Sequence, residues 1–291
     1  MSVQQSWVPE RQATNPHAEA AIPELVEGSP RPAVTKIRVL GMGMGPRHVT
    51  PEVSEALRDC SCVVALDKSA TPGAHAGDGR DEQLAVRQAV ADAHGVPVVV
   101  VPDPPRDRND PTDYRAAVAD WHAARVEALA SAVRDRSGTI ALLAWGDPSL
   151  YDSMVRLAEQ LADRLSCDWD VLPGISAPQL LAARHKIVLH RVGEPVHITT
   201  ARRLPEALAQ GQRNVLVMLT GARVLDELAV RPELAGWQLW WSANLGAAGE
   251  RNVSGVVPEV VPLARAARAE ALASDGWVMD LFLLRAPGQS S

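Results

Sequence analysis

The chain has 291 residues, and its 29 basic against 35 acidic residues give a formal net charge of −6. Apolar residues make up 46% of the chain, which is typical of a folded globular protein, and the length allows about two domains. The acidic balance argues against a general nucleic-acid binder, and three cysteines are too few for a disulfide framework.

Residues 1–35 are predicted to form a disordered extension, because five prolines interrupt them and their apolar residues show no periodicity. They also lack the apolar segment of a secretory signal. No run elsewhere approaches the ~20 apolar residues that span a bilayer. We therefore expect a cytoplasmic protein with no membrane segment.

From residue 36, short Val- and Leu-rich segments alternate with Ala-rich amphipathic segments, which predicts a mostly parallel sheet covered by helices. Thr50 as N-cap followed by Pro51 predicts the start of the first helix, and Gly95 ends the second. Four prolines exclude residues 102–113 from helix and central strand. The expected strands of this N-terminal domain (36–172) are 36–40, 62–66, 98–101, 139–144 and 169–172, and its later helices are 81–93, 113–136 (capped by Thr112) and 149–165.

Pro173–Ser176 is predicted to be a hinge into a second α/β domain, residues 173–291. The expected strands there are 196–200, 215–219, 237–241, 252–257 and 277–284, with helices near 176–184, 223–229 and 258–273. Because no crossover helix separates residues 241 and 252, we expect antiparallel pairing in this half. The sequence therefore predicts an α/β fold of two α/β domains.

Three loops follow predicted strands of the N-terminal domain: Gly41–Pro46, Trp145–Pro148 and Pro173–Ala177. Ligands bind at the carboxyl ends of strands in open α/β sheets. These loops are therefore the candidates for a binding site.

The first loop has glycines at 41, 43 and 45, and glycine permits positive φ and close approach of a ligand. Asp67 ends the next strand, where a ribose-binding acid of a dinucleotide site would lie. However, the dinucleotide fingerprint requires a third glycine where this chain has Pro46. An NAD-dependent oxidoreductase is therefore the weaker hypothesis, and a glycine-rich turn without a ligand is also open.

The other two loops have structural explanations of equal or greater weight. Asp147 could accept hydrogen bonds from a ligand, or it could cap a helix that begins at Pro148. Ser176 could hold a polar ligand, but a plain helix cap explains it more simply.

Taken together, the ordered motifs resemble the tetrapyrrole methylase family from residue 36 to 286. The shared elements are GxGxG, an aspartate that ends the second strand, GDPSLY and PGISA. Several segments are most similar to one branch of that family, namely VALDK (64–68), PDPPRDR (102–108), AWGDPSLYDS (144–153), LPGISAPQLLAARHKI (172–187), RVGEPVHITTARRL (191–204) and GWVMDLFLLR (276–285).

This resemblance implies two α/β domains with a deep cleft between them, usually in a homodimer. S-adenosylmethionine would lie in that cleft, with S-adenosylhomocysteine as its product. The implied cofactor-binding positions are Gly41, Gly43, Met44, Gly45, Trp145, Gly146, Asp147, Ser176, Ala177, Met218 and Ala243. The family commonly has proline where this chain has Met44, so the role of Met44 is open.

The branch that the chain resembles methylates precorrin-5 at C1 and releases its acetyl group as acetate. Methylation at another corrin position, and a tetrapyrrole carrier without catalysis, are alternative hypotheses. Removal of the acetyl group needs an activated water and hence a general base. Asp67 is the first candidate for the base and Tyr151 the second, while each also has a structural explanation as a cap, an ion pair or a packed ring.

A tetrapyrrole substrate carries many carboxylates, which arginine pairs with in bidentate fashion. The candidate substrate-binding residues are Arg106, Arg108, Arg184 and Arg191. Cys60 and Cys62 lack the further ligands of a metal site, so we expect buried free thiols and no metal.

Overall fold

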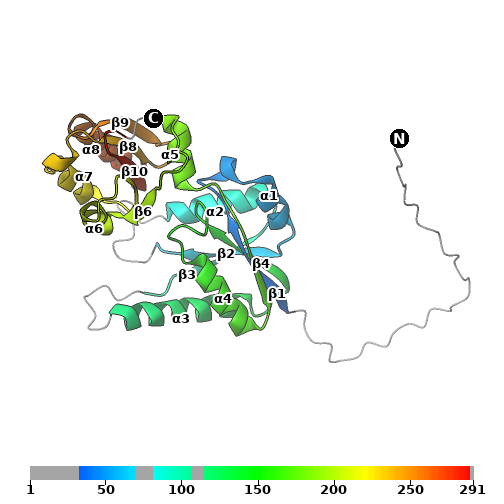
Figure 1. Ribbon diagram of the computed structural model, residues 1–291. Coiled ribbons are helices and arrows are strands. Elements are labelled where there is room, and N and C mark those ends of the chain that lie inside the picture. The colour runs from blue at the N-terminus through cyan, green and yellow to red at the C-terminus, as the bar shows by residue number, and fades with distance from the viewer. Residues whose placement is uncertain (1–32, 70–80, 106–113, 289–291) are drawn as a thin grey trace, which may run out of the picture. The chain divides into compact units, whose positions relative to one another are not determined.

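The computed structural model describes residues 33–69, 81–105 and 114–288, which contain two five-stranded sheets and their helices (Figure 1). Residues 32–291 belong to one compact unit. In the described part of the chain, no helix is both long and apolar enough to cross a membrane.

The first sheet is entirely parallel, with the strand order β3-β2-β4-β1-β5. Helices α1 and α2 pack on one of its faces and α3 and α4 on the other, as right-handed crossovers require when the chain first moves toward β3 and then back toward β5. The strands are β1 (Val34–Gly41), β2 (Cys62–Asp67), β3 (Val98–Pro102), β4 (Gly138–Ala144) and β5 (Asp168–Leu172), and the helices are α1 (Pro51–Arg58), α2 (Glu82–Ala93), α3 (Tyr114–Val133) and α4 (Met154–Leu165).

The second sheet is mixed, with the order β6-β7-β10-β8-β9. Only β6 and β7 run parallel, and the other pairs are antiparallel, which confirms the expected pairing. Its strands are β6 (His197–Thr200), β7 (Asn214–Met218), β8 (Gln238–Ala243), β9 (Arg251–Val256) and β10 (Asp280–Arg285), and the helices of this half are α5 (Ala177–His185), α6 (Leu204–Ala209), α7 (Ala222–Ala229) and α8 (Val257–Asp275).

Several predicted boundaries are wrong. Strand β1 begins at Val34, because Val34 is buried and pairs with Gly138, and β10 begins at Asp280 instead of residue 277. Helix α4 begins at Met154 and not at residue 149, because Asp147 and Asp152 each accept a hydrogen bond from a backbone amide two residues later and so form turns. The short helix α6 was not predicted.

Other expectations fall outside the described residues. They include the extension up to residue 32 and the cap at Thr112. The division into domains at residues 172 and 173 stays a prediction, although the first sheet ends at Leu172 and helix α5 begins at Ala177.

Candidate active site

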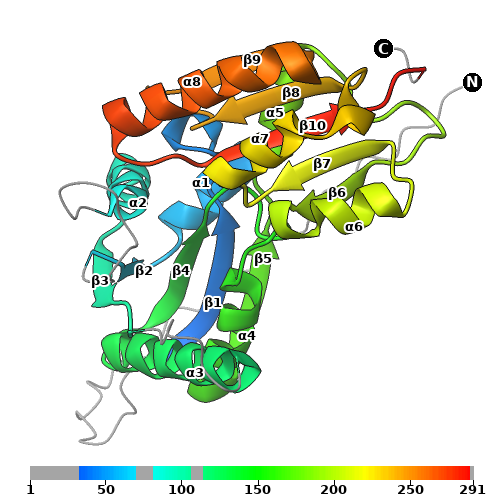
Figure 2. The same cartoon turned by 90° about the vertical axis from the view of Figure 1, so that its left-hand side faces the viewer.

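The three candidate loops converge at the carboxyl edge of the first sheet, where β1, β4 and β5 lie side by side (Figure 2). Gly43 and Gly146 exchange two backbone hydrogen bonds, with N···O distances of 3.2 and 2.8 Å. The amide of Gly174 donates to the carboxylate of Asp147 over 2.9 Å. The three loops are therefore tied to one another by hydrogen bonds of the main chain and one carboxylate.

Two glycines are required because these loops pack main chain against main chain. A Cβ on Gly41 would lie 2.4 Å from the nitrogen of Gly174, and a Cβ on Gly174 would lie 2.3 Å from the oxygen of Gly146. Neither distance is compatible with a side chain. The sequence suggested that the glycines of the first loop permit close approach of a ligand, but at Gly41 the space is filled by the neighbouring loop.

Gly146 differs, because its surroundings are more open. It has φ of +71°, and a Cβ there would lie 3.9 Å from the nitrogen of Ala177 and from Cα of Ser176, and 3.5 Å from Sδ of Met44. The second loop thus faces the start of α5. The Ser176 hydroxyl caps that helix in a capping box with Gln179, as the simpler explanation predicted.

Asp147 connects two of the loops. Of the two alternatives left open for it, the helix cap is wrong, because no helix begins at Pro148. It accepts hydrogen bonds from the amides of Ser149 and Gly174 and from the Ser149 hydroxyl. Burial by itself would raise the pKa of Asp147, but these hydrogen bonds outweigh burial and hold the pKa below its ordinary value.

We expect Asp147→Asn to lower the free energy of unfolding by about 1 kcal/mol at pH 7, a small value because water reaches this carboxylate. A depressed pKa in the folded state means that the contribution is present above the unfolded pKa of about 3.9 and is lost as the pH falls through the folded value. Urea unfolding from pH 7 to 3 should show the two proteins converging below about pH 4. A constant difference over this range would contradict the assignment.

An apolar cluster joins these loops to the second sheet. Its buried members are Met44, Leu180, Leu181, Leu216, Leu245, Leu281 and Leu283, and we call it the bridging cluster. Trp145, Ala177 and Met218 pack against it. The structure therefore brings together Met44, Trp145, Ala177 and Met218, which the family resemblance assigns to one cofactor site.

The first loop also contacts the turn after β8. A Cβ on Gly246 would lie 2.4 Å from the Met44 oxygen, and Gly45 faces the Gly246 oxygen. Ala243, a predicted cofactor contact, is buried in the core of the second sheet. The residue after it, Asn244, adopts φ of +48° and is fully buried, with its side chain bonded to Asp275.

Arg184, a candidate substrate-binding residue, is paired with a carboxylate in this structure. Its Nε lies 2.6 Å from an oxygen of Glu250, whose other oxygen accepts the amide of Gly246. Hydrogen bonds from Arg184 and Gly246 hold the pKa of Glu250 below its ordinary value although burial opposes them. Arg184 thus supports the 244–250 turn.

Asp67 lies where the first sheet splits. The β2–β4 ladder consists of Cys62 opposite Ile140 and Val63 opposite Ala141, whereas β2 stays paired with β3 as far as Asp67. Ser69 donates to the Asp67 carboxylate from its amide (2.8 Å) and its hydroxyl (2.9 Å). These bonds hold Asp67 at the carboxyl edge, beside the split.

A buried guanidinium occupies the region next to this split. Arg87 of α2 is 7% exposed, and its Nε donates to the oxygen of Leu143 in β4 over 3.0 Å. Burial, together with the nearby charges of Arg87 and Arg125, lowers the pKa of Lys68. Arg87 was missed in the sequence, yet it lies on the same helix face as buried Val90 and Ala91, and a cation on an apolar face was the available signal.

Tyr151 links the second loop to the second sheet. It has φ of +51°, and its hydroxyl lies 3.4 Å from the oxygen of Ile198 in β6. The ring is 47% exposed. A non-glycine residue in the left-handed region is strained by about 1 kcal/mol, which is common at functional sites.

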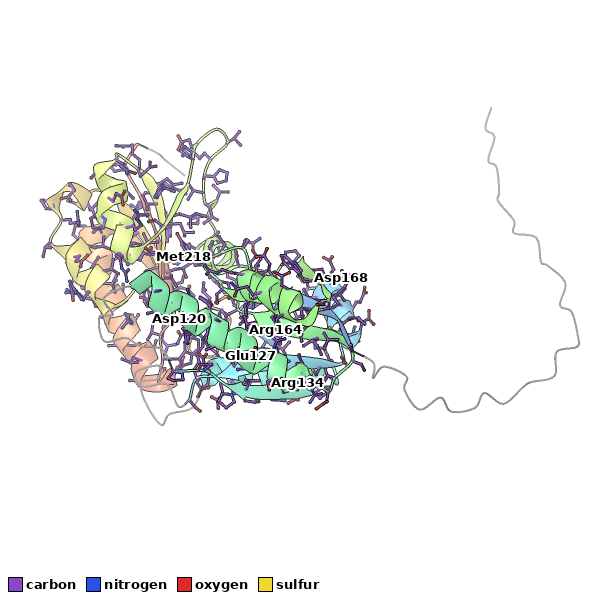
Figure 3. All side chains as sticks on the ribbon, turned by 90° about the horizontal axis from the view of Figure 1, so that it is seen from below. Asp120, Glu127, Arg134, Arg164, Asp168 and Met218 are labelled. Carbon is purple, nitrogen blue, oxygen red and sulfur yellow. The ribbon has the colours of Figure 1, made fainter. Side chains whose placement is uncertain are left out.

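The remaining predicted residues are less informative. Arg191 lies in the partly exposed loop before β6, and Arg106 and Arg108 lie outside the described residues. A shallow cavity of about 160 Å³ between α3, α4 and the start of β1 has Arg134 and Arg164 among its lining residues. Figure 3 shows these two arginines far from Met218, so the cavity is not part of the candidate site.

One family model and one curated relative match most of the chain. A family model described as Tetrapyrrole (Corrin/Porphyrin) Methylases matches residues 36–261. The chain is 36% identical over 256 residues to a precorrin-6A synthase [deacetylating] of Sinorhizobium sp, covering 86% of this chain and 95% of the relative.

Solved structures of similar proteins also match most of the chain. The structure of a cobalamin synthesis related protein (CobF) from Corynebacterium diphtheriae has a TM-score of 0.70 at 36% identity, with 87% of this chain and 99% of that chain covered. A uroporphyrin-III C-methyltransferase of Thermus thermophilus, complexed with S-adenosylhomocysteine, has a TM-score of 0.51 at 15% identity, with 86% and 92% covered, and shares the fold.

Proposed function

Because the chain belongs to the tetrapyrrole methylase family, we propose that it is an S-adenosylmethionine-dependent methyltransferase of corrin synthesis that acts on precorrin-5. It methylates C1 and releases the C1 acetyl group as acetate, which gives precorrin-6A. The observation that carries this proposal is the convergence of the three loops into one main-chain scaffold, in a chain 36% identical to a deacetylating precorrin-6A synthase.

The residues at the converging loops fit S-adenosylmethionine. A Cβ on Gly146 would lie 3.9 Å from the amide nitrogen of Ala177, so this glycine leaves room for about one methyl group there. The buried Nε1 of Trp145 has no acceptor among residues 33–69, 81–105 and 114–288. We assign the binding of the methyl donor to Trp145–Asp147, Ser176, Ala177 and Met218. The first loop would contact the donor from its other side through Gly41, Gly43, Met44 and Gly45. The bound group supplies an electrophilic methyl on a sulfonium.

Asp67 is proposed as the general base. Asp67 takes a proton from water as the water oxygen bonds to the acetyl carbonyl carbon. The bond between that carbon and C1 then breaks, acetate leaves, and the electron pair remains on C1 and the conjugated macrocycle. The electron pair on C1 would then form the bond to the methyl group, whose bond to sulfur breaks, so that the pair of that bond stays on the sulfur of S-adenosylhomocysteine. The position beside the split of the first sheet, and the two bonds from Ser69 that orient the carboxylate, support this role.

Tyr151 is proposed to hydrogen-bond the acetyl oxygen. Its half-exposed ring, its strained backbone and its contact with β6 support a role at a substrate-facing surface. The hydroxyl would stabilise the negative charge that develops on this oxygen as water adds.

The carboxylates of the substrate are proposed to bind arginine side chains at the site. These local positive charges must offset the net charge of −6 that the whole chain carries. We expect Arg106→Ala together with Arg108→Ala to raise the KM for the tetrapyrrole about tenfold, the loss typical of charged hydrogen bonds, without changing the affinity for S-adenosylhomocysteine. Steady-state kinetics and calorimetry measure the two quantities. Arg58→Ala, at an exposed position of α1, is the control. An unchanged KM in the double variant would exclude residues 102–113 from substrate binding.

A homodimer in the cytoplasm is also proposed, from the resemblance to the family. Light scattering of the purified protein tests the dimer, and a monomeric mass would contradict it.

The decisive experiment is incubation with precorrin-5 and methyl-labelled S-adenosylmethionine, followed by mass and acetate analysis. Labelled product with stoichiometric acetate supports the proposal. Labelled product that retains its acetyl group indicates methylation at another position, and bound tetrapyrrole without label indicates a carrier. Titration with S-adenosylhomocysteine and with NAD separates the methyltransferase from an oxidoreductase.

A further inference from the structure

The indole nitrogen of Trp145 is an unpaired buried donor. Nε1 is inaccessible to water and has no hydrogen-bond acceptor in the described part of the chain. Buried indole N–H groups usually have a partner, and leaving such a group unpaired costs about 1–3 kcal/mol. An acceptor supplied by a bound molecule would remove this cost.

The position of Trp145 indicates which molecule. The residue directly follows β4, and its neighbour Gly146 is bonded to Gly43. Its ring meets Trp277 edge to face, with 6.2 Å between centroids and 86° between planes, and it packs against the bridging cluster together with Ala177 and Met218. The ring also packs against the apolar cluster under α1 and α2, so Trp145 lies where the three loops converge.

Other unpaired buried atoms have different explanations. Nε of Arg268 lies 3.4 Å from a carboxylate oxygen of Asp280, so their charges attract one another. Burial, and after it the nearby charges of Arg184 and Arg47, lower the pKa of His48. The imidazole can therefore remain neutral, with no proton on the buried Nδ1. The indole N–H of Trp145 has no such alternative state, because it is a donor only.

We propose that the indole N–H of Trp145 donates a hydrogen bond to an oxygen of bound S-adenosylmethionine, and so selects and orients the methyl donor. This inference rests on the proposed function. It assigns a side-chain contact in a site otherwise built from backbone groups. The acceptor is a ribose hydroxyl or the carboxylate of the methionyl part, both of which present oxygen lone pairs.

Trp145→Phe tests the contact, because it keeps an aromatic ring and removes the N–H. We expect the Kd for S-adenosylhomocysteine to rise about 3- to 30-fold, the range for loss of one neutral or charged hydrogen bond. The midpoint of thermal unfolding of the free protein should stay the same or rise, because an unpaired donor has been removed. Trp277→Phe perturbs the same ring contact but leaves the Trp145 N–H in place, and we expect affinity within twofold of wild type.

Titration with 5′-methylthioadenosine, which has the ribose but no carboxylate, identifies the acceptor. If the Trp145→Phe effect persists with this ligand, the acceptor is on the ribose, and if it vanishes, the acceptor is the carboxylate. Wild type and Trp145→Phe binding S-adenosylhomocysteine equally would overturn the inference. Failure of wild type to bind it at all would instead overturn the proposed function and the inference with it.

Two further measurements cover the case in which Trp145→Phe does not fold. Trp145→Met is flexible and lacks a donor, and should show the same loss of affinity. In the wild-type protein labelled with ¹⁵N on its eight tryptophans, S-adenosylhomocysteine should move one indole N–H signal downfield. If no indole signal moves downfield, the inference is wrong.

Discussion

Asp67→Asn is expected to abolish acetate release, lowering kcat at least 100-fold, while the affinity for S-adenosylhomocysteine stays within a few-fold of wild type. The amide keeps the shape of the carboxylate and can still accept a bond from Ser69, but it cannot take a proton from water. General bases typically contribute 10²- to 10⁴-fold to a rate. Acetate assay and calorimetry on the same preparation measure the two quantities.

Asp59→Asn is the matched control, because Asp59 is an exposed carboxylate directly after α1. This variant removes the same charge from the same half of the chain and should retain full turnover. Normal acetate release by Asp67→Asn would remove Asp67 from the reaction and leave Tyr151 as the candidate to test next.

Gly174→Ala is expected to lower the free energy of unfolding by about 3 kcal/mol and to weaken S-adenosylhomocysteine binding at least tenfold. The added Cβ would lie 2.3 Å from the Gly146 oxygen and 2.6 Å from the carbonyl of Gly41, and both neighbours are backbone atoms that cannot rotate away. Overpacking of this kind costs about 1–3 kcal/mol, and the loops must separate to accept it. Urea unfolding and calorimetry provide the measurements.

Gly221→Ala is its control. Gly221 has φ of −154°, and a Cβ there meets nothing within 4 Å, so stability should change by less than about 0.5 kcal/mol. If Gly174→Ala were as stable as Gly221→Ala, the tight contact of the three loops would not exist in solution.

The sequence predicted those elements whose signals are local. Thr50 before Pro51 marked the start of α1, and Ser176 marked the start of α5. The alternation of buried strands and amphipathic helices gave the parallel sheet. The absence of a crossover between β8 and β9 gave the antiparallel pairing in the second sheet.

What could not be predicted depends on contacts between distant residues. For Asp147 the sequence left a helix cap and a ligand contact open, and nothing in the local sequence shows that its carboxylate accepts a hydrogen bond from Gly174, 27 positions later. The glycines suggested space for a ligand, and only the packing of three loops shows that Gly41 and Gly174 face each other. Arg87 was missed because its acceptor is the Leu143 carbonyl of another element. Long-range pairing, not propensity, decides each of these cases.

The scaffold at the carboxyl edge is held mainly by amide and carbonyl groups, which every amino acid carries. The surrounding side chains can consequently change with little effect on the platform, as long as the few positions without room for a methyl group are kept. For protein engineering, this means that selectivity should be sought around Tyr151 and the second sheet, and that Gly41 and Gly174, which have no room for a methyl group, should be left untouched.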